Sequence, residues 1–330
     1  MQIGSADRDI SIGEVTGTAS KFGLIIEGSV EGNGLYSGVA ANGLVIGGRG
    51  GAVSIANGIG VSGSVLAASN GASATAYRLA SGATTPLLQN TGTIGATAGN
   101  ADTALATAVQ IDVGASLPTL KNSGTIKAVT GEKGASAAIR DASGTLALVE
   151  NAGTISATGA KEGDRNIAID LSRATGDSVI RQTQVGTGNT APSITGDVRF
   201  AGGNDTLDLA DGTLAGNVSF GTGNNRLALS GDAAQSGSVS FGGGVDTVAL
   251  AGTGTLKGVV DFGGGGDVLT LAGSSSSQAR SATRQALQSR LRAVRSTSAS
   301  RPLWPLSTWV PQAFSSSLST GLPEPVRHIT

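Results

Sequence analysis

Short stretches of alternating apolar and polar residues recur four times between residues 196 and 272. Each unit contains Val-x-Phe, then a glycine-rich turn, then Leu-x-Leu or Val-x-Leu. Alternation puts the apolar residues of each strand on one face. A unit of two short strands cannot bury that face alone, but it can when it is stacked on a copy of itself. The pattern therefore predicts two-strand coils of 20–21 residues over 196–273. Four phenylalanines mark the coils: Phe200, Phe220, Phe241 and Phe262.

Looser units of about 30 residues precede these coils. The sequence Asn-x-Gly-Thr-Ile occurs three times at nearly regular intervals, and each copy follows a short apolar stretch. With a further apolar stretch upstream of each, residues 73–195 are predicted to form three-strand coils that end in a junction over 182–195. The repeated asparagines are expected to stack as an amide ladder at one corner. They are Asn90, Asn122 and Asn151.

Equal spacing places equivalent side chains of neighbouring coils over one another, ~4.8 Å apart. The phenylalanines are therefore predicted to form one column. A second column lies five residues after each phenylalanine. Residues 1–72 continue the apolar pattern less regularly and are predicted to form irregular solenoid coils. The second column comprises Asp205, Asn225, Asp246 and Asp267.

Composition separates the C-terminal segment 274–330 from the rest of the chain. The chain has 330 residues and a net charge of −1, but residues 1–273 carry 52 of the 53 glycines and a net charge of −7. Residues 274–330 carry seven arginines, one glutamate, five of the eight prolines and a net charge of +6. We predict a non-solenoid tail over 274–330 that is disordered or partly helical. A shift of the coding frame near codon 274 is an alternative origin for it.

Composition also limits the chemistry. The absence of cysteine excludes disulfides, thiolate zinc sites and a cysteine nucleophile. The single histidine, His328, lies in the tail, so a Ser-His-Asp triad or a histidine metal site on the repeats is excluded. No apolar run reaches ~18 residues, and no transmembrane helix is predicted. We predict no catalytic residues and no cofactor.

The Asn-x-Gly-Thr-Ile units and the Val-x-Phe units resemble the passenger domain of bacterial autotransporters, the type V secretion proteins with a pertactin-like β-helix. The resemblance covers about 73–272, with weaker support over 1–72. It implies an all-β fold, a right-handed parallel β-helix exposed at the cell surface or secreted. Members of the family typically add an N-terminal signal peptide and a C-terminal outer-membrane barrel. The opening MQIGSADRDI shows no signal-peptide pattern, and no run of barrel strands follows Gly273.

Two kinds of chemistry remain open on the repeats. The Gly-Gly-x-Asp-x-Leu segments resemble half of the calcium-binding nonapeptide, so a calcium ladder along Asp205, Asn225, Asp246 and Asp267 is one hypothesis. β-Helices also include polysaccharide-degrading enzymes, which need clustered carboxylates in a groove. The candidates are Asp205, Asp208 and Asp211. Asp208 is predicted on the outer face and Asp211 in the following corner.

The resemblance, together with the lack of a catalytic constellation, implies a non-catalytic stalk or adhesion scaffold that presents loops away from a cell surface. A β-helical polysaccharide-degrading enzyme and a non-functional fragment of a frameshifted autotransporter gene are the alternatives. The expected partners are host or bacterial surface molecules, or a second copy that pairs through open strand edges at the ends of the rod. Nucleic acid is not expected as a partner.

Overall fold

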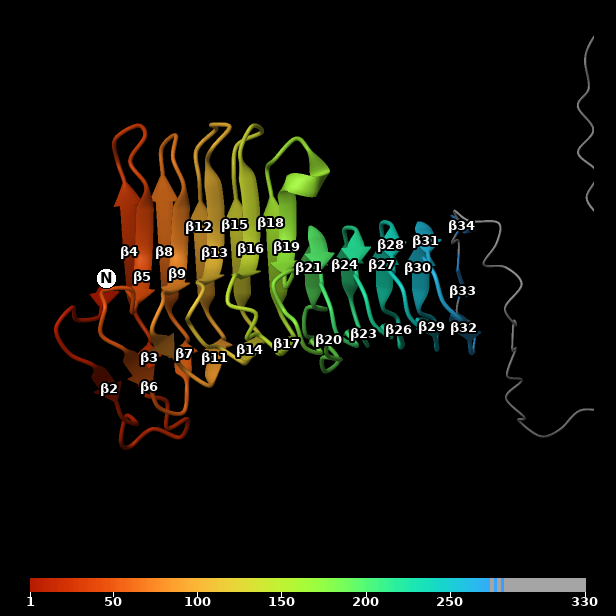
Figure 1. Ribbon diagram of the computed structural model, residues 1–330, viewed down its shortest axis with the longest axis horizontal. Coiled ribbons are helices and arrows are strands. Elements are labelled where there is room, and N and C mark those ends of the chain that lie inside the picture. Colours follow the sequence, from red (N-terminus) through yellow and green to blue (C-terminus); the bar gives the residue numbers. More distant parts are fainter. Residues whose placement is uncertain (274–275, 278–279, 282–330) are drawn as a thin grey trace, which may run out of the picture. The chain divides into compact units, whose positions relative to one another are not determined.

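Parallel strands stack coil upon coil in this protein (Figure 1). The structure, a computed structural model, describes residues 1–273, 276–277 and 280–281. The strands within each sheet pair in parallel, and the one helical segment of the described residues is the short 3-10 turn η1 (Gly163–Arg165). The predicted all-β, parallel β-helical fold is confirmed.

Three long sheets form the sides of the rod. Sheet 1 has eleven strands. In spatial order these are β1 (Gln2–Ile3), β5 (Ala41–Ile46), β9 (Ala74–Leu79), β13 (Leu105–Ile111), β16 (Ala135–Asp141), β19 (Asn166–Asp170), β22 (Asp197–Arg199), β25 (Val218–Ser219), β28 (Val239–Ser240), β31 (Val259–Asp261) and β34 (Arg280–Ser281).

Sheets 2 and 3 have ten strands each. Sheet 2 contains β3 (Leu24–Ile26), β7 (Ile59–Val61), β11 (Leu87–Asn90), β14 (Thr119–Asn122), β17 (Leu148–Asn151), β20 (Val179–Gln182), β23 (Thr206–Leu209), β26 (Arg226–Leu229), β29 (Thr247–Leu250) and β32 (Val268–Leu271). Sheet 3 contains β4 (Ser29–Gly34), β8 (Ser64–Ser69), β12 (Thr93–Thr97), β15 (Thr125–Val129), β18 (Thr154–Thr158), β21 (Ser193–Thr195), β24 (Thr213–Ala215), β27 (Ala234–Ser236), β30 (Thr255–Lys257) and β33 (Ser276–Ser277).

The first coils carry a fourth side. A small sheet made of β2 (Ile10–Ile12), β6 (Val53–Ile55) and β10 (Ala83–Thr84) lies between sheets 1 and 2 along the chain. Residues 1–72 also supply β1, β3, β4, β5, β7 and β8, which pair in register with the coils that follow. This N-terminal segment therefore belongs to the same stack as the rest of the solenoid.

Columns of apolar side chains fill the interior. Because each column is in register, every coil covers the apolar surface of the next one. Stacking therefore buries the apolar face that a single coil would expose to water. The column through sheet 1 illustrates this, and every member is at most 1% exposed. It runs through Leu44, Tyr77, Val109, Ile139, Ile169, Val198, Val218 and Val239.

The coils from β4 to β19, which we call the wide coils, carry an extra flattened layer, the fin. It consists of the parts of sheets 1 and 3 between β4 and β19 that rise together at the top of Figure 1. The two sheets approach closely there, since a Cβ on Gly32 would lie 1.9 Å from the carbonyl oxygen of Asn42. Small side chains make this approach possible. Two buried columns of alanine lie in these strands: Ala67, Ala96, Ala128 and Ala157 in sheet 3, and Ala76, Ala108, Ala138 and Ala168 in sheet 1.

Charged residues cover the last edge of the fin. The turn Lys161–Arg165 follows β18 and holds η1. The guanidinium of Arg165 donates to the carbonyl oxygen of Asp102 (3.0 Å), and that of Arg199 donates to the carbonyl oxygen of Asp164 (2.6 Å). A charged turn at a strand edge discourages pairing with another chain. The fin therefore ends in a polar cap where the rod narrows.

The coils over 196–273, which we call the narrow coils, have three strands each, whereas the repeats predict two. The third strand lies in sheet 3, as β24, β27 or β30. In β24 the side chain of Leu214 points inward between Thr213 and Ala215, which are exposed. A strand with one inward apolar residue shows no repeated alternation of apolar and polar residues, so the sequence pattern does not predict this strand.

Pairing also continues past the predicted boundary at Gly273. Strand β33 pairs with β30, and β34 pairs with β31, so part of one more coil follows. The rest of the predicted tail, including His328, lies outside the described residues.

Candidate functional site

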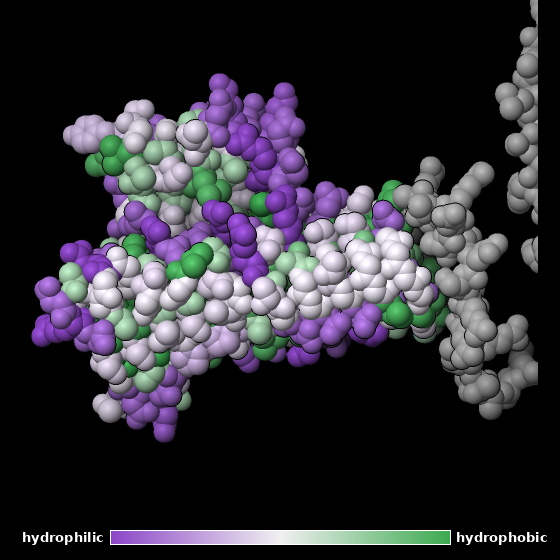
Figure 2. All heavy atoms as spheres, in the orientation of Figure 1, coloured by the Kyte–Doolittle hydropathy of each residue, from purple (hydrophilic) through white to green (hydrophobic). Residues whose placement is uncertain are grey.

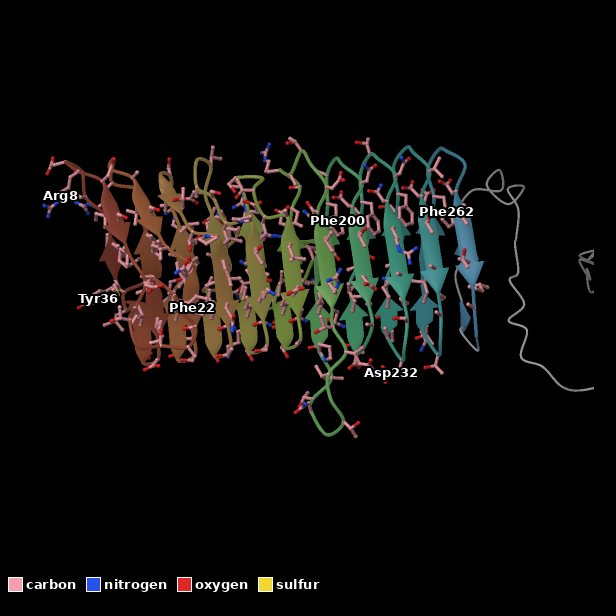
Figure 3. The ribbon with its side chains drawn as sticks, turned by 90° about the horizontal axis from the view of Figure 1, so that it is seen from below. Arg8, Phe22, Tyr36, Phe200, Asp232 and Phe262 are labelled. Carbon is pink, nitrogen blue, oxygen red and sulfur yellow. The ribbon has the colours of Figure 1, made fainter. Side chains whose placement is uncertain are left out.

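Three of the columns in which polar side chains stack along the coils concern the site, two inside the rod and one outside. Each column is fixed by the strand register, because parallel pairing places equivalent residues of successive coils side by side. These columns hold the polar residues that the sequence singled out, and Figure 3 shows the side chains in rows along the coils.

The first inner column is a ladder of amides in sheet 2. The side-chain nitrogen Nδ2 of Asn90 donates to Oδ1 of Asn122 at 2.8 Å, and Nδ2 of Asn122 donates to Oδ1 of Asn151 at 2.9 Å. Nδ2 of Asn151 then donates to Oε1 of Gln182 at 3.1 Å. All four side chains are buried. Burial strengthens such bonds, and an unpaired amide there would be costly.

The same amides hold the corner of each coil. Asn90, Asn122 and Asn151 each donate to the carbonyl oxygen of the glycine two residues later, at 3.3, 3.2 and 3.1 Å. The short asparagine side chain reaches its own turn and the next coil together. The ladder therefore has a structural role, since the side-chain nitrogens of the three asparagines donate within and between coils, while the buried Oδ1 of Asn90 at its first end has no partner.

Gln182 was missed as a ladder residue. The sequence placed it at the start of a junction without alternation, yet it ends β20 and pairs with Asn151. It donates from Nε2 to the carbonyl oxygen of Asp211 at 2.7 Å. It follows Asn151 at nearly the interval that separates Asn151 from Asn122, so spacing was the signal that could have found it. Leucine takes over the column at Leu209.

The phenylalanine column lies inside the narrow coils. Ring centroids of successive residues are 4.9, 4.6 and 5.6 Å apart, with planes within 10° of parallel. The row runs from Phe200 to Phe262, as Figure 3 shows. Phe220 and Phe241 stand between rings on both sides, whereas Phe262 is only partly buried. The stack packs one coil onto the next.

The aspartate–asparagine column also faces inward. Asp205, Asn225 and Asp246 are at most 1% exposed. Each Oδ1 accepts a hydrogen bond from the backbone N–H of the preceding coil: Ser178 to Asp205 (2.8 Å), Asp205 to Asn225 (3.0 Å), Asn225 to Asp246 (2.8 Å) and Asp246 to Asp267 (3.0 Å). The column thus ties successive coils through backbone donors.

Two carboxyl groups of this column have shifted pKa values. Burial is the largest cause that raises the pKa of Asp205, from 3.8 to about 6, and the charge of Asp177 adds to it. Burial likewise raises the pKa of Asp246, with a smaller contribution from Asp267. Oδ2 of both residues is buried without a hydrogen-bond partner. Each carboxyl group therefore has one oxygen bonded and one unsatisfied.

Calcium binding by this column stays a prediction. Oδ1 of each member is already occupied by a backbone N–H, which leaves few oxygens for the ~6–8 ligands that Ca²⁺ prefers. Within the described part of the chain, no group of three or more Asp, Glu, His or Cys side chains lies close enough to hold a metal ion.

The third column carries alternating charges on the outer face of sheet 2. Nζ of Lys121 lies 2.8 Å from Oε2 of Glu150, and Arg181 lies 3.6 Å from Oε1 of Glu150 and 3.8 Å from Oδ2 of Asp208. Asp208 is on the outer face, as expected. Asp211 follows β23 in a corner, where its Oδ2 accepts the backbone N–H of Val185 at 3.0 Å.

The carboxylates of the outer column bear on the enzyme hypothesis. Glu150 and Asp208 are two strands apart, ~10 Å, and Arg181 lies between them and pairs with both. A shallow hollow of about 240 Å³ beside this column is lined by one carboxylate, Glu150, together with Gln89, Lys121 and Thr183. Asp205 is buried in another column. The structure does not bring Asp205, Asp208 and Asp211 into one groove.

The fold defines the class of protein, a parallel β-helix. No helix of the described residues is long and apolar enough to cross a membrane. Comparison of the chain with protein-family models, with curated protein sequences and with solved structures finds no match.

Replacing Asn122 with alanine should lower the free energy of unfolding by about 2–3 kcal/mol. The change removes the donor to Asn151 and the acceptor for Asn90, so in each buried amide the atom that was bonded to Asn122 keeps only longer bonds to the backbone. Urea unfolding followed by circular dichroism measures the loss. Lys121→Ala is the matched control, since Lys121 is the preceding residue on the outer face of the same strand. Its exposed ion pair predicts a change within about 1 kcal/mol. Equal losses would contradict the ladder's role.

Proposed function

We propose that this chain is a non-catalytic β-helical segment of an autotransporter-like surface protein, where it acts as a stalk or adhesion scaffold. The observation that supports the proposal most is the unbroken register of sheet 3. Ten strands at a spacing of ~4.8 Å give a stack on the order of 45 Å long. A continuous rod of this kind separates its two ends and presents its sides.

The outer surface suits presentation. Large apolar residues lie in small scattered groups over the face in Figure 2, and hydrophilic residues gather over the end of the fin that is next to the narrow coils. Sheet 3 presents a row of hydroxyl groups along nearly its whole length, broken at Ala234. These residues are Ser29, Ser64, Thr93, Thr125, Thr154, Ser193, Thr213 and Thr255.

The partners we propose are molecules on host or bacterial surfaces, or a second copy of the chain. The first loop of the fin supports a contact role, since Leu35 and Tyr36 are each 80% exposed there (Figure 3). Exposed aromatic and aliphatic side chains are typical anchors of protein interfaces. This apolar loop is at the opposite end of the fin from its charged turn.

Surface display tests the proposal. The full chain is placed between an export signal and an outer-membrane translocator in a Gram-negative host, and the carrier without the chain is the control. We expect the chain to reach the surface as a protease-resistant rod and to increase attachment of the cells to host-cell or bacterial surfaces.

Retention inside the cell while the carrier reaches the surface would contradict the proposal. Release of reducing sugar from polysaccharides by the purified chain, lost in Glu150→Gln, would favour the enzyme hypothesis instead.

A further inference from the structure

The aspartate–asparagine column contains one asparagine, and its hydrogen bonds show which donor and acceptor atoms this position uses. Asn225 stands between Asp205 and Asp246 in the same register, one residue before the paired Thr206, Arg226 and Thr247. Its Oδ1 accepts the backbone N–H of Asp205. Its Nδ2 donates to the carbonyl oxygen of Gly223 at 3.1 Å and to Oδ1 of Asp246 at 3.0 Å. The position therefore uses one acceptor atom and one donor atom.

Asp205 and Asp246 match the acceptor half of this arrangement. Their Oδ1 atoms accept the backbone N–H groups of Ser178 and Asn225. Their Oδ2 atoms take the role of Nδ2 in Asn225 and are buried without a partner. An ionised carboxylate is acceptor-only, and so is a backbone carbonyl. If the neighbour of such an Oδ2 is a carbonyl oxygen, as it is for Nδ2 of Asn225, the Oδ2 is satisfied only when it carries a proton itself.

The turns before these residues have the same backbone shape. Gly203, Gly223 and Gly244 precede their column residue by two positions, and their φ angles are +116°, +119° and +139°. The carbonyl oxygen that accepts from Asn225 thus has a counterpart in each neighbouring coil. We propose that Asp205 and Asp246 are carboxylic acids in the folded protein, each donating its Oδ2 proton to the carbonyl oxygen of Gly203 or Gly244, so that acid stabilises the narrow coils.

The electrostatic surroundings support a proton. Asp205 faces Ser178 and Asn225 and is next to the charge of Asp177. Asp246 faces Asn225 and Asp267. Both charged neighbours are acidic. Among the ion pairs of the described residues, none joins a lysine or arginine to a carboxyl group of this column. Ionisation would place buried negative charges near others without compensation.

The direction of the pH effect follows from the proton balance. The folded protein raises the pKa of Asp205 from 3.8 to about 6, so the folded state holds a proton that the unfolded chain releases in this range. Stability from this group is full below pH 3.8 and is lost as the pH rises through about 6. One such group increases the unfolding equilibrium constant roughly 100-fold across the range. Asp246 acts in the same direction.

Unfolding of the full chain at about pH 5 and pH 8 tests the proposal. We expect the wild-type urea midpoint to fall at the higher pH. Asp205→Asn and Asp246→Asn should each raise the midpoint at the higher pH and reduce its pH dependence, because the amide supplies the missing donor permanently. Asn225→Asp should increase the dependence. Asp208→Asn on the outer face of sheet 2 is the control and should leave it unchanged.

A direct measurement guards against variants that fail to fold. The infrared spectrum of the folded wild type at about pH 5, below the raised pKa of Asp205, should show the carbonyl stretch of a protonated carboxyl group that Asp205→Asn weakens. Absence of that band, or a lower midpoint at the higher pH for both aspartate-to-asparagine variants, would overturn the proposal. So would a rise of the wild-type midpoint with Ca²⁺ at the higher pH that Asp246→Asn abolishes, since a cation would then take the place of the proton.

Discussion

Replacing Gly244 with alanine should unfold the narrow coils. Gly244 has a φ of +139°, a backbone conformation that L-residues with a Cβ rarely adopt. An added Cβ would also lie 2.1 Å from the carbonyl oxygen of Gly223 in the preceding coil. Backbone strain and the steric clash together should cost at least about 4 kcal/mol, because neither atom can move without breaking the register. Urea unfolding followed by circular dichroism measures the loss.

The neighbouring glycine is the matched control. A Cβ on Gly243 would meet its nearest atom at 3.9 Å, and its φ is not positive. Gly243→Ala should therefore change the free energy of unfolding by less than about 1 kcal/mol. Limited proteolysis should cleave the Gly244→Ala protein within 196–273 and leave the Gly243→Ala protein as resistant as the wild type. If both variants have the same free energy of unfolding and the same resistance to proteolysis, close contact between the turns of successive coils does not limit how near the coils can lie.

Replacing Phe220 with alanine should lower the free energy of unfolding by about 3–5 kcal/mol. Its ring is fully buried and lies between two parallel rings, with centroids 4.9 Å from that of Phe200 and 4.6 Å from that of Phe241. Truncation leaves a cavity in the middle of the stack, and rigid coils on both sides cannot close around it. Heat or urea unfolding measures the loss.

The end of the same stack provides the comparison. Phe262 has one stacked neighbour at 5.6 Å and is only partly buried. Phe262→Ala should cost less than half as much as Phe220→Ala, because part of its ring already contacts solvent. A similar loss for both variants would mean that the stack contributes no more than ordinary burial of one side chain.

Much of this fold follows from spacing in the sequence. Recurrence of phenylalanine every 20–21 residues, together with the alternation around it, is sufficient to predict parallel coils in register. In such coils, equal spacing places Phe220 over Phe200 and Asn122 over Asn90. The strand register and the side-chain contacts show these pairs as neighbours. Periodicity has this power because a one-residue slip would turn every apolar side chain outward.

Other features lacked a periodic signal. The strand around Leu214 has one inward apolar residue, and its counterpart in the next coil is Gln235, so hydrophobicity does not mark the third side of the narrow coils. The ladder continues with glutamine at Gln182, where the Asn-x-Gly-Thr-Ile motif does not recur. The fin depends on alanine, which occurs throughout the chain and intrinsically favours helices over strands, so it does not indicate a strand.

The protonation state of the Asp column was not predictable from the residues alone. The sequence placed Asp205 and Asp246 in one column and suggested calcium binding as one hypothesis for it. The inward direction of the side chains depends on where β23 and β29 begin, and only the structure shows that their Oδ2 atoms are buried without partners. The direction of the aspartate side chain, more than the residue type, decides whether the column is an exposed cation site or a row of buried carboxylic acids.

The narrowing of the rod has a mechanical consequence. Hydrogen bonds between coils run along the rod axis, so a force that pulls its ends apart loads the coils in series. Strands β13 and β16 are paired at six residues in the wide part, whereas β25 and β28 are paired at two. The narrow coils should therefore peel away first and one at a time, each releasing 20–21 residues of slack. Under tension the narrow coils would extend by unfolding while the wide coils stay folded.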